Sequence, residues 1–112
     1  MAKIKKHRKA VLEALEEYRS QFRLSSYDLQ PHILADEEKH HYQFLWMGWK
    51  DDRQIFNVSI HIELKNDKIW IQKDSTETGI ANLLVQRGIS KSDIVLAYFS
   101  PTHRKLTEFA VG

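Results

Sequence analysis

Residues 68–88 (KIWIQKDSTETGIANLLVQRG) constrain the fold most, because they predict a strand, a turn and a helix in immediate succession. The run 69–71 is apolar on both faces of a pleat, so we expect this strand to be covered on both sides. Asp74 suits a helix N-cap, and Glu77 three residues later completes a pair that resembles a capping box. Gly88 is placed to end the helix in a left-handed conformation.

The next apolar run, 94–99, predicts a last interior strand that ends before Pro101. A strand, a helix and a second strand in this order allow the two strands to lie parallel through a right-handed crossover. Residues 102–112 then form a tail with apolar side chains that are able to dock on the body: Leu106, Phe109 and Val111.

Upstream of this unit, the pattern predicts one amphipathic helix and an antiparallel meander of strands. Residues 3–23 repeat apolar side chains every three or four positions, which is typical of a helix lying on a sheet. A turn at 25–28 leads to a strand at 29–35, where Pro31 favours an edge position. The strand 41–49 is apolar on both faces and is expected to be central.

Residues 54–64 alternate between apolar and polar side chains, which indicates a strand with one face toward the core. The apolar set expected on one face is Phe56, Val58, Ile60, Ile62 and Leu64. The polar set expected on the other face is Asn57, Ser59, His61, Glu63 and Lys65. The dipeptide Asn66-Asp67 tolerates positive φ and predicts a two-residue hairpin loop into the strand at 69–71.

Length and composition indicate one α+β domain over 1–112, an antiparallel β-meander sheet with an N-terminal amphipathic helix and a strand–helix–strand C-terminal half. The chain has no cysteine, which excludes disulfides and thiolate zinc sites and fits a cytoplasmic location. No apolar run approaches the roughly 20 residues of a membrane-spanning helix. The basic N-terminus lacks the apolar segment of a secretory signal, so we expect no membrane association.

Positive charge is concentrated at the N-terminus. The first nine residues carry five positive charges and no negative one, which leaves a net charge of −3 for the rest of a chain whose total is +2. Lys5, Lys6 and Arg8 are the candidates for contact with a phosphate backbone. A dedicated DNA-binding domain usually has a basic face over much of its surface, so we expect DNA contact to be indirect or weak.

The titratable residues form no catalytic, cofactor or metal constellation, and we expect neither an enzyme nor a small-molecule substrate. His61 and Glu63 match the H-x-E of zinc deaminases, but those enzymes need a cysteine pair. Residues 63–65 match the E-x-K fragment of metal-dependent nucleases, with an aspartate pair upstream, but the fragment is short and common. His40 and His41 are adjacent, so on a strand they point to opposite faces and cannot chelate one metal together.

The richest polar cluster of the sequence is explained by capping. Asp74, Thr76 and Glu77 can satisfy the free amides at a helix start, with an anion site at that terminus as the alternative. The polar face of 54–64 raises a different question, because its neighbouring strands are apolar on both sides. Either a helix covers the middle of that face or a second protein does, and we expect a protein-binding surface that includes Ser59, His61 and Glu63.

Several segments, in their order and spacing, carry a family resemblance: KIWIQ, TETGIA, DIVLAYFSP and the terminal TEFAV, with YQFLWMGW and VSIHIELKN upstream. They resemble the XisI family, the fdxN element excision controlling factor proteins of cyanobacteria. The resemblance covers essentially the whole chain and implies an XisI-like α+β fold. Ser75 stands where we expect glycine in many members, which leaves the turn geometry at this position open.

The resemblance implies a role in programmed excision of a DNA element during heterocyst differentiation, beside a recombinase and a nuclease-like companion, XisH. It implies no catalytic, cofactor or metal residue. We expect the chain to bind the XisH-like companion through the polar strand face or through four tail residues, Arg104, Lys105, Thr107 and Phe109. Self-association, direct DNA contact as a recombination regulator, and inhibition of the companion nuclease as an antidote stay open.

Overall fold

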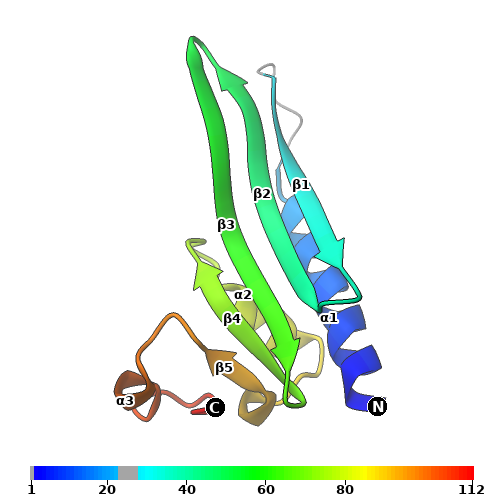
Figure 1. Ribbon diagram of the computed structural model, residues 1–112, viewed down its shortest axis with the longest axis vertical. Helices are drawn as coiled ribbons and strands as arrows, with labels where there is room; N and C mark the ends of the chain where they lie inside the picture. The colour runs from blue at the N-terminus through cyan, green and yellow to red at the C-terminus, as the bar shows by residue number, and fades with distance from the viewer. Residues whose placement is uncertain (1, 23–27) are drawn as a thin grey trace.

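The computed structural model describes residues 2–22 and 28–112, and it shows a five-stranded sheet with two helices packed on one face (Figure 1). The elements are α1 (Ala2–Arg19), β1 (Leu29–Asp36), β2 (His41–Lys50), β3 (Arg53–Lys65), β4 (Lys68–Asp74), α2 (Ile80–Gln86), the 3-10 turn η1 (Lys91–Asp93), β5 (Ile94–Leu96) and α3 (Pro101–Arg104). The strands lie across the sheet in the order β1-β2-β3-β4-β5. The first four are antiparallel neighbours and β5 runs parallel to β4, which confirms the predicted α+β architecture.

α1 lies along the sheet because its apolar side chains recur on one face of the helix. Its fully buried side chains include Val11, Ala14 and Leu15. The helix ends at Arg19, earlier than predicted, because the amides of Gln21 and Phe22 bond to carbonyl oxygens three residues back instead of four. Arg23 and the predicted turn residues 25–27 lie outside the described residues.

The core lies between the two helices and the sheet face that they cover. Its largest buried side chains from the sheet are Tyr42, Phe44, Ile60, Ile62, Ile69 and Ile71. Leu15 of α1 and Leu84 of α2 pack against them, and both are shielded from solvent. Strands β2 and β3 are interior to the sheet and β1 is an edge strand, as Pro31 and the apolar pattern of 41–49 predict.

One register shift divides β3 between the two faces of the sheet. Phe44 pairs with Ile60 and Leu45 pairs with Val58, so Ser59 is an extra residue without its own partner on β2. Because side chains alternate between faces, one extra residue moves the preceding part of the strand to the opposite face.

This bulge overturns the prediction that five apolar residues of 54–64 share one face. Ile60, Ile62 and Leu64 are buried against the helices. Phe56 and Val58 lie on the other face of the sheet, and Phe56 is 66% exposed.

Two predicted local signals are confirmed. Asn66 and Asp67 have φ angles of 53° and 60°, as a two-residue type I′ turn requires, and they lead β3 into β4. Gly88 has a φ of 90° and follows α2 in a Schellman-type end, in which the amide of Ile89 donates to the carbonyl oxygen of Leu84 at 3.1 Å.

α2 begins later than we predict, at Ile80, with Gly79 as its N-cap. Asp74 still supports this helix start, because its Oδ2 accepts the amide of Ile80 at 2.7 Å and its Oδ1 accepts the amide of Thr76 at 2.9 Å. The hydroxyl of Thr76 accepts the amide of Gly79 at 3.0 Å. Glu77 is exposed and takes no part in these bonds, so an Asp–Thr turn replaces the predicted capping box.

β5 is parallel to β4, as the strand–helix–strand pattern predicts, but it ends at Leu96 instead of residue 99. Pro101 begins the short helix α3, with Ser100 as its N-cap, so this proline starts a helix where we expected only a tail. The tail then returns to the sheet, where the amide of Ala110 donates to the carbonyl oxygen of Ile94 at 2.9 Å. Within the described part of the chain, no helix is both long and apolar enough to cross a membrane.

Candidate protein-binding face of the sheet

The candidate site lies on the face of the sheet that α1 and α2 leave uncovered, which we call the outer face. Residues directly opposite each other in an antiparallel pair share a face, so the register defines its members on β1, β2 and β3. They include Leu34, His41, Gln43, Leu45, Met47, Trp49, Phe56, Val58, His61 and Glu63. The outer face changes from polar to apolar along the β2–β3 hairpin toward its tip.

Four side chains form a polar cluster in the middle of the outer face: His41, Gln43, His61 and Glu63. Nδ1 of His41 lies 3.0 Å from Nε2 of His61, and Nε2 of Gln43 lies 2.9 Å from Nδ1 of His61. One set of tautomers satisfies these contacts, in which Gln43 donates to His61 and His61 donates in turn to His41. In this arrangement the N–H of His41 is on Nε2, which lies 3.6 Å from a carboxylate oxygen of Glu63.

His61, at the centre of the polar cluster, is held in its uncharged form by its surroundings. Burial lowers the pKa of His61, and the neighbouring His41 lowers it further, although Glu63 acts in the opposite direction. His61 is therefore uncharged at pH 7 and offers hydrogen bonds instead of charge. Beside it, a hollow of about 280 Å³ opens between β1 and the cluster, and Leu34 and Asp36 line it with the two histidines.

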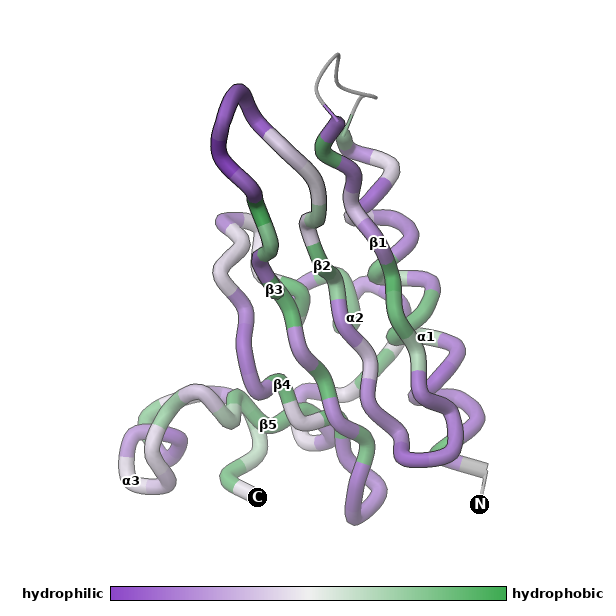
Figure 2. The backbone as a smooth tube through the Cα atoms, turned by 45° about the horizontal axis from the view of Figure 1, so that its top comes forward, coloured by the Kyte–Doolittle hydropathy of each residue, from purple (hydrophilic) through white to green (hydrophobic). Residues whose placement is uncertain are grey.

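Toward the hairpin tip the outer face becomes apolar. Its exposed large side chains there are Leu34, Met47, Trp49 and Phe56. Leu45 is buried, yet it lies outside the main core because it points away from the helices. Figure 2 shows a hydrophobic stretch of β3 next to the strongly hydrophilic tip. Exposed apolar residues that gather in this way mark an interaction surface more often than scattered ones do.

The opposite end of the outer face, over β4 and β5, is covered by the tail. Val95 is fully buried there and forms a parallel bridge with Ala110. Arg104 lies with its guanidinium 5.6 Å from the centre of the Trp70 ring. This guanidinium and its Nε donate to three carbonyl oxygens at 3.0, 3.4 and 3.4 Å, those of Phe99, Ala97 and Val111.

Three of the four tail residues proposed for partner contact hold the tail in place. Arg104 makes the carbonyl bonds just described, and its own carbonyl oxygen accepts the hydroxyl of Thr107 at 2.8 Å. Thr107 in turn accepts the amide of Phe109 at 3.2 Å, and Phe109 packs half-buried against the core. Lys105 is exposed and remains accessible to a partner.

The three strand residues proposed for partner contact are divided by the bulge. Ser59 is buried, and its hydroxyl donates to the carbonyl oxygen of Phe44 at 3.3 Å. His61 and Glu63 lie in the polar cluster. Sequence reasoning missed His41 and Gln43 as their neighbours, because regular pairing across the predicted 50–53 turn places His61 opposite Tyr42 and only the bulge at Ser59 brings it opposite Gln43.

The proposed DNA-contact residues lie on the first turns of α1, where Lys5 and Lys6 are exposed. Nε of Arg8 lies 3.8 Å from a carboxylate oxygen of Glu37, so part of its charge is already compensated. The basic N-terminus therefore presents fewer free charges than its sequence suggests.

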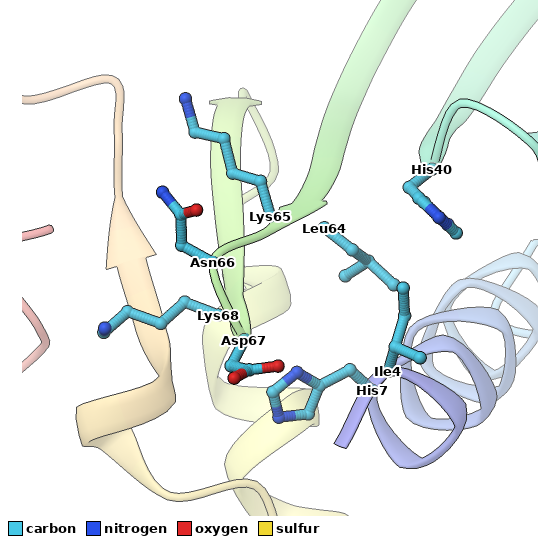
Figure 3. A pocket seen from close by; sticks show the side chains of 8 residues that line it. All are labelled: Ile4, His7, His40, Leu64, Lys65, Asn66, Asp67 and Lys68. Atoms are coloured by element: carbon cyan, nitrogen blue, oxygen red, sulfur yellow. The ribbon is translucent and has the colours of Figure 1, made fainter. Parts of the chain in front are cut away.

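A second hollow, of about 400 Å³, lies between the start of α1 and the β3–β4 turn (Figure 3). His7 and His40 line it together with Ile4 and Leu64, while the side chain of Lys68 extends away from the imidazoles. His7 is 2% exposed, and its Nε2 lies 3.4 Å from a carboxylate oxygen of Asp93. This arrangement explains His7 as a structural residue that joins α1 to η1.

The described residues contain no group of three histidine, aspartate or glutamate side chains placed to hold a metal ion. Within the E-x-K fragment, Nζ of Lys65 lies 3.9 Å from a carboxylate oxygen of Glu63, on one face of β3. The upstream aspartates Asp51 and Asp52 lie at the hairpin tip, at the other end of this 13-residue strand. The nuclease-like pattern is therefore not assembled in space.

The fold and this face define a class: a small α+β protein whose sheet is covered by helices on one side and exposed to solvent on part of the other. A family model described as XisI protein matches residues 1–111, and the chain belongs to the XisI family.

Two solved structures from Anabaena variabilis ATCC 29413 are similar to the chain. One, a XisI-like protein, is 32% identical with a TM-score of 0.87, and the alignment covers 96% of this chain and 97% of that one. The other, described as the fdxN element excision controlling factor XisI, is 28% identical with a TM-score of 0.83 over 98% of this chain and 99% of that one. Among curated proteins, none matches the chain.

Proposed function

We propose that this chain is a non-enzymatic accessory factor in the excision of a DNA element and that it acts by binding another protein through the outer face. The family and the name of the second solved relative support the role in excision control. The observation that carries the binding role is an open sheet face on which exposed apolar side chains adjoin a hydrogen-bonded polar cluster.

The chemistry of this face suits a protein partner. Interfaces combine an apolar core, rich in aromatic residues and methionine, with polar groups that fix orientation. Trp49 and Met47 supply the apolar part, and His61, whose pKa is lowered by burial, supplies hydrogen bonds without a charge to desolvate. The hollow beside Leu34 offers a recess for one side chain of the partner.

The partner that we propose is an XisH-like companion, a protein that resembles nucleases. The resemblance of the chain to the XisI family is what supports a companion of this kind, with a role in the excision of the element during heterocyst differentiation. A chain that binds a nuclease-like protein is able either to direct that protein or to inhibit it, and both outcomes use the same contact.

Capture of the purified companion on the immobilised chain tests this proposal. We expect the double substitution Met47→Lys and Trp49→Lys to weaken capture by roughly tenfold or more, because a charge then replaces each of two apolar contacts. Leu106→Lys is the matched control, since Leu106 is 83% exposed on the tail and receives the same change. Capture by the double variant at wild-type affinity would contradict the outer face as the contact.

Direct contact with DNA is the alternative, and the exposed Lys5 and Lys6 favour it. Binding of that kind weakens steeply as salt increases, because it releases counterions from the phosphate backbone. The comparison is therefore a salt titration of DNA binding by the wild type and by the variant Lys5→Ala, Lys6→Ala. A steep salt dependence that this variant loses would favour the DNA route over the protein route.

A further inference from the structure

The hollow beside the polar cluster, of about 280 Å³, is smaller than the roughly 300–1,000 Å³ of small-molecule sites and suits one side chain of a partner. Leu34 and Ala35 form its apolar wall. Of the described residues that line it, Asp36 is the one carboxylate, and none is a lysine or an arginine. Such a hollow favours positive charge as long as its two histidines are neutral.

Two oxygen atoms in the wall of this hollow are free to accept hydrogen bonds. Oδ1 of Asp36 accepts two backbone amides of the β1–β2 turn at 3.1 and 2.9 Å, which fixes the carboxylate, and no described residue donates to Oδ2. Nε2 of Gln43 donates to His61, and no described residue donates to the amide oxygen Oε1. Both oxygens suit the N–H groups of a lysine or arginine side chain, whose alkyl part can lie against Leu34.

The pair of His41 and His61 decides which amide atom Gln43 presents. The 3.0 Å contact between Nδ1 of His41 and Nε2 of His61 needs one N–H and one lone pair. The four ring nitrogens of a neutral pair carry two protons, and one of these lies in the contact. The other lies on Nε2 of His41, because a lone pair there would face a carboxylate oxygen of Glu63 at 3.6 Å. Nδ1 of His61 is then unprotonated and accepts from Gln43.

A third proton on the pair changes this arrangement in one way. The contact still needs one lone pair, so the other three ring nitrogens are all protonated, whichever imidazole holds the charge. Nδ1 of His61 is one of those three and becomes a donor. Gln43 must then turn its amide over, so that Oε1 takes the place of Nε2 beside His61. The atom that Gln43 directs away from His61 changes from an acceptor oxygen to a donor nitrogen.

We propose that the hollow binds a lysine or arginine side chain of the companion while the histidine pair is neutral, and that one proton on the pair releases it. The proton acts twice, because it replaces the acceptor that Gln43 presents with a donor and places a positive charge beside Asp36. This inference rests on the proposed function. It names the chemistry that the outer face recognises and the condition under which recognition is lost.

Other charged or titratable residues share the outer face with the pair, whereas α1 and α2 lie on the opposite face of the sheet. They are His32 and Asp36 on β1, Glu63 and Lys65 on β3, and Lys73 on β4. Two carboxylates and two lysines balance each other, so a proton on the pair makes this region positive. Burial lowers the pKa of His61 below its ordinary value of 6.5, so the release belongs to mildly acidic conditions.

Nuclear magnetic resonance of the isolated full chain tests the turnover of Gln43 without the companion. Nitrogen-15 shifts report which ring nitrogens carry protons. Between about pH 8 and 5 we expect Nδ1 of His61 to become protonated, while one nitrogen of the contact with His41 stays unprotonated. A pair whose four ring nitrogens all carry protons at about pH 5 would overturn the inference. An amide nitrogen of Gln43 that stays beside His61 over the whole range would do the same.

Capture of the companion by charge variants tests the occupant of the hollow. Asp36→Asn keeps an oxygen for the turn amides and removes the negative charge, so we expect capture at about pH 7.5 to weaken roughly tenfold. Glu38→Gln is the matched control, since Glu38 is exposed, loses the same charge and does not line the hollow. Equal effects of the two substitutions would overturn the assignment of a lysine or arginine to the hollow.

The pH dependence of capture tests the effect of the proton. From about pH 7.5 to 5.5, wild-type capture should weaken by roughly fivefold more than capture by Gln43→Met, which presents neither amide atom. His32→Gln removes another histidine of the outer face and should keep the wild-type dependence. The same dependence in the wild type and in Gln43→Met would overturn the inference. A wild type that captures no companion at any pH would overturn the proposed function and the occupant with it, whereas failure of the turnover shows in the resonances alone.

Discussion

The two halves of β3 are one continuous strand and differ in almost every other respect. Residues 60–63 pair with strands on both sides, and Ile60, Ile62 and Leu64 lie under α1 and α2. Residues 53–58 pair on one side only and expose Phe56. The half near the β3–β4 turn belongs to a layered core, whereas the half near the tip is a single layer of sheet.

This difference shows where the chain holds its stability and where it offers contacts. Burial of apolar surface supplies most of the stabilisation of a fold, and it is concentrated in the layered half. Segments with few buried contacts contribute little to global stability and are the usual source of binding surfaces. We therefore expect substitutions in the layered half to lower the free energy of unfolding more than substitutions near the tip.

The largest effect is expected at Ile62, which is fully buried and pairs with Ile71 across β3 and β4. Ile62→Ala removes three carbon atoms from the core and should lower the free energy of unfolding by about 2–4 kcal/mol. Ile62→Val is the matched control, with an expected loss of about 1 kcal/mol. Urea denaturation measures both losses. A loss no larger in Ile62→Ala than in Ile62→Val would contradict the assignment of Ile62 to the stabilising core.

A smaller effect is expected where the tail closes the layered half. Arg104 donates to three carbonyl oxygens, so Arg104→Ala should lower the free energy of unfolding by about 1–3 kcal/mol through the lost charge-assisted bonds. The adjacent exposed Lys105 serves as control, and Lys105→Ala should change stability by less than about 0.5 kcal/mol. Equal effects at the two positions would show that the tail does not contribute to the core.

Lowering the pH should destabilise the layered half through protonation of His7. Burial lowers the pKa of His7 below its ordinary value of 6.5, although Asp93 opposes this shift. The unfolded chain then binds the proton more readily, so the stability that neutral His7 contributes is present above pH 6.5 and is lost as pH falls below it.

The variant His7→Gln should remove this dependence. The stability of the wild type minus that of the variant is expected to be constant above about pH 7 and to decrease below it, by at most about 1.4 kcal/mol per pH unit. Denaturant titrations between about pH 5 and 8 measure this difference. A difference that stays flat over the whole range would remove His7 as the cause.

The smallest effect is expected near the hairpin tip. Trp49 is 48% exposed on the outer face, and Trp49→Thr keeps a residue that favours strands, so the loss of stability should stay below about 1 kcal/mol. Thermal or urea unfolding of the variant at low protein concentration measures it. A loss as large as that of Ile62→Ala would show that the tip is part of the core and not a separate contact region.

Much of the fold could be predicted from short stretches of sequence. The hairpin at Asn66-Asp67, the end of α2 at Gly88, the edge position of β1 and the parallel β5 all follow from local signals or from chain order. The candidate site could be predicted only in part. His61 and Glu63 were recognised, but their neighbours were not.

These neighbours were missed because the pairing of β2 with β3 shifts by one residue. A regular hairpin through the 50–53 turn places His61 opposite Tyr42, on the helix side of the sheet. The extra residue Ser59 moves the pairing by one, so that His61 lies opposite Gln43 and beside His41. Alternation along a single strand contains no information about such a shift, because a bulge is defined by two strands together.

The sequence by itself determined the order of the main helix and strands, the hairpin turn at Asn66-Asp67, and that the family is XisI, because these depend on neighbouring residues and on their order. Only the tertiary structure decided which face each half of β3 presents, how the tail covers β4 and β5, and which edge stays open. Those features depend on the pairing and relative lengths of strands that are separated along the chain, and a bulge of one residue is enough to change them.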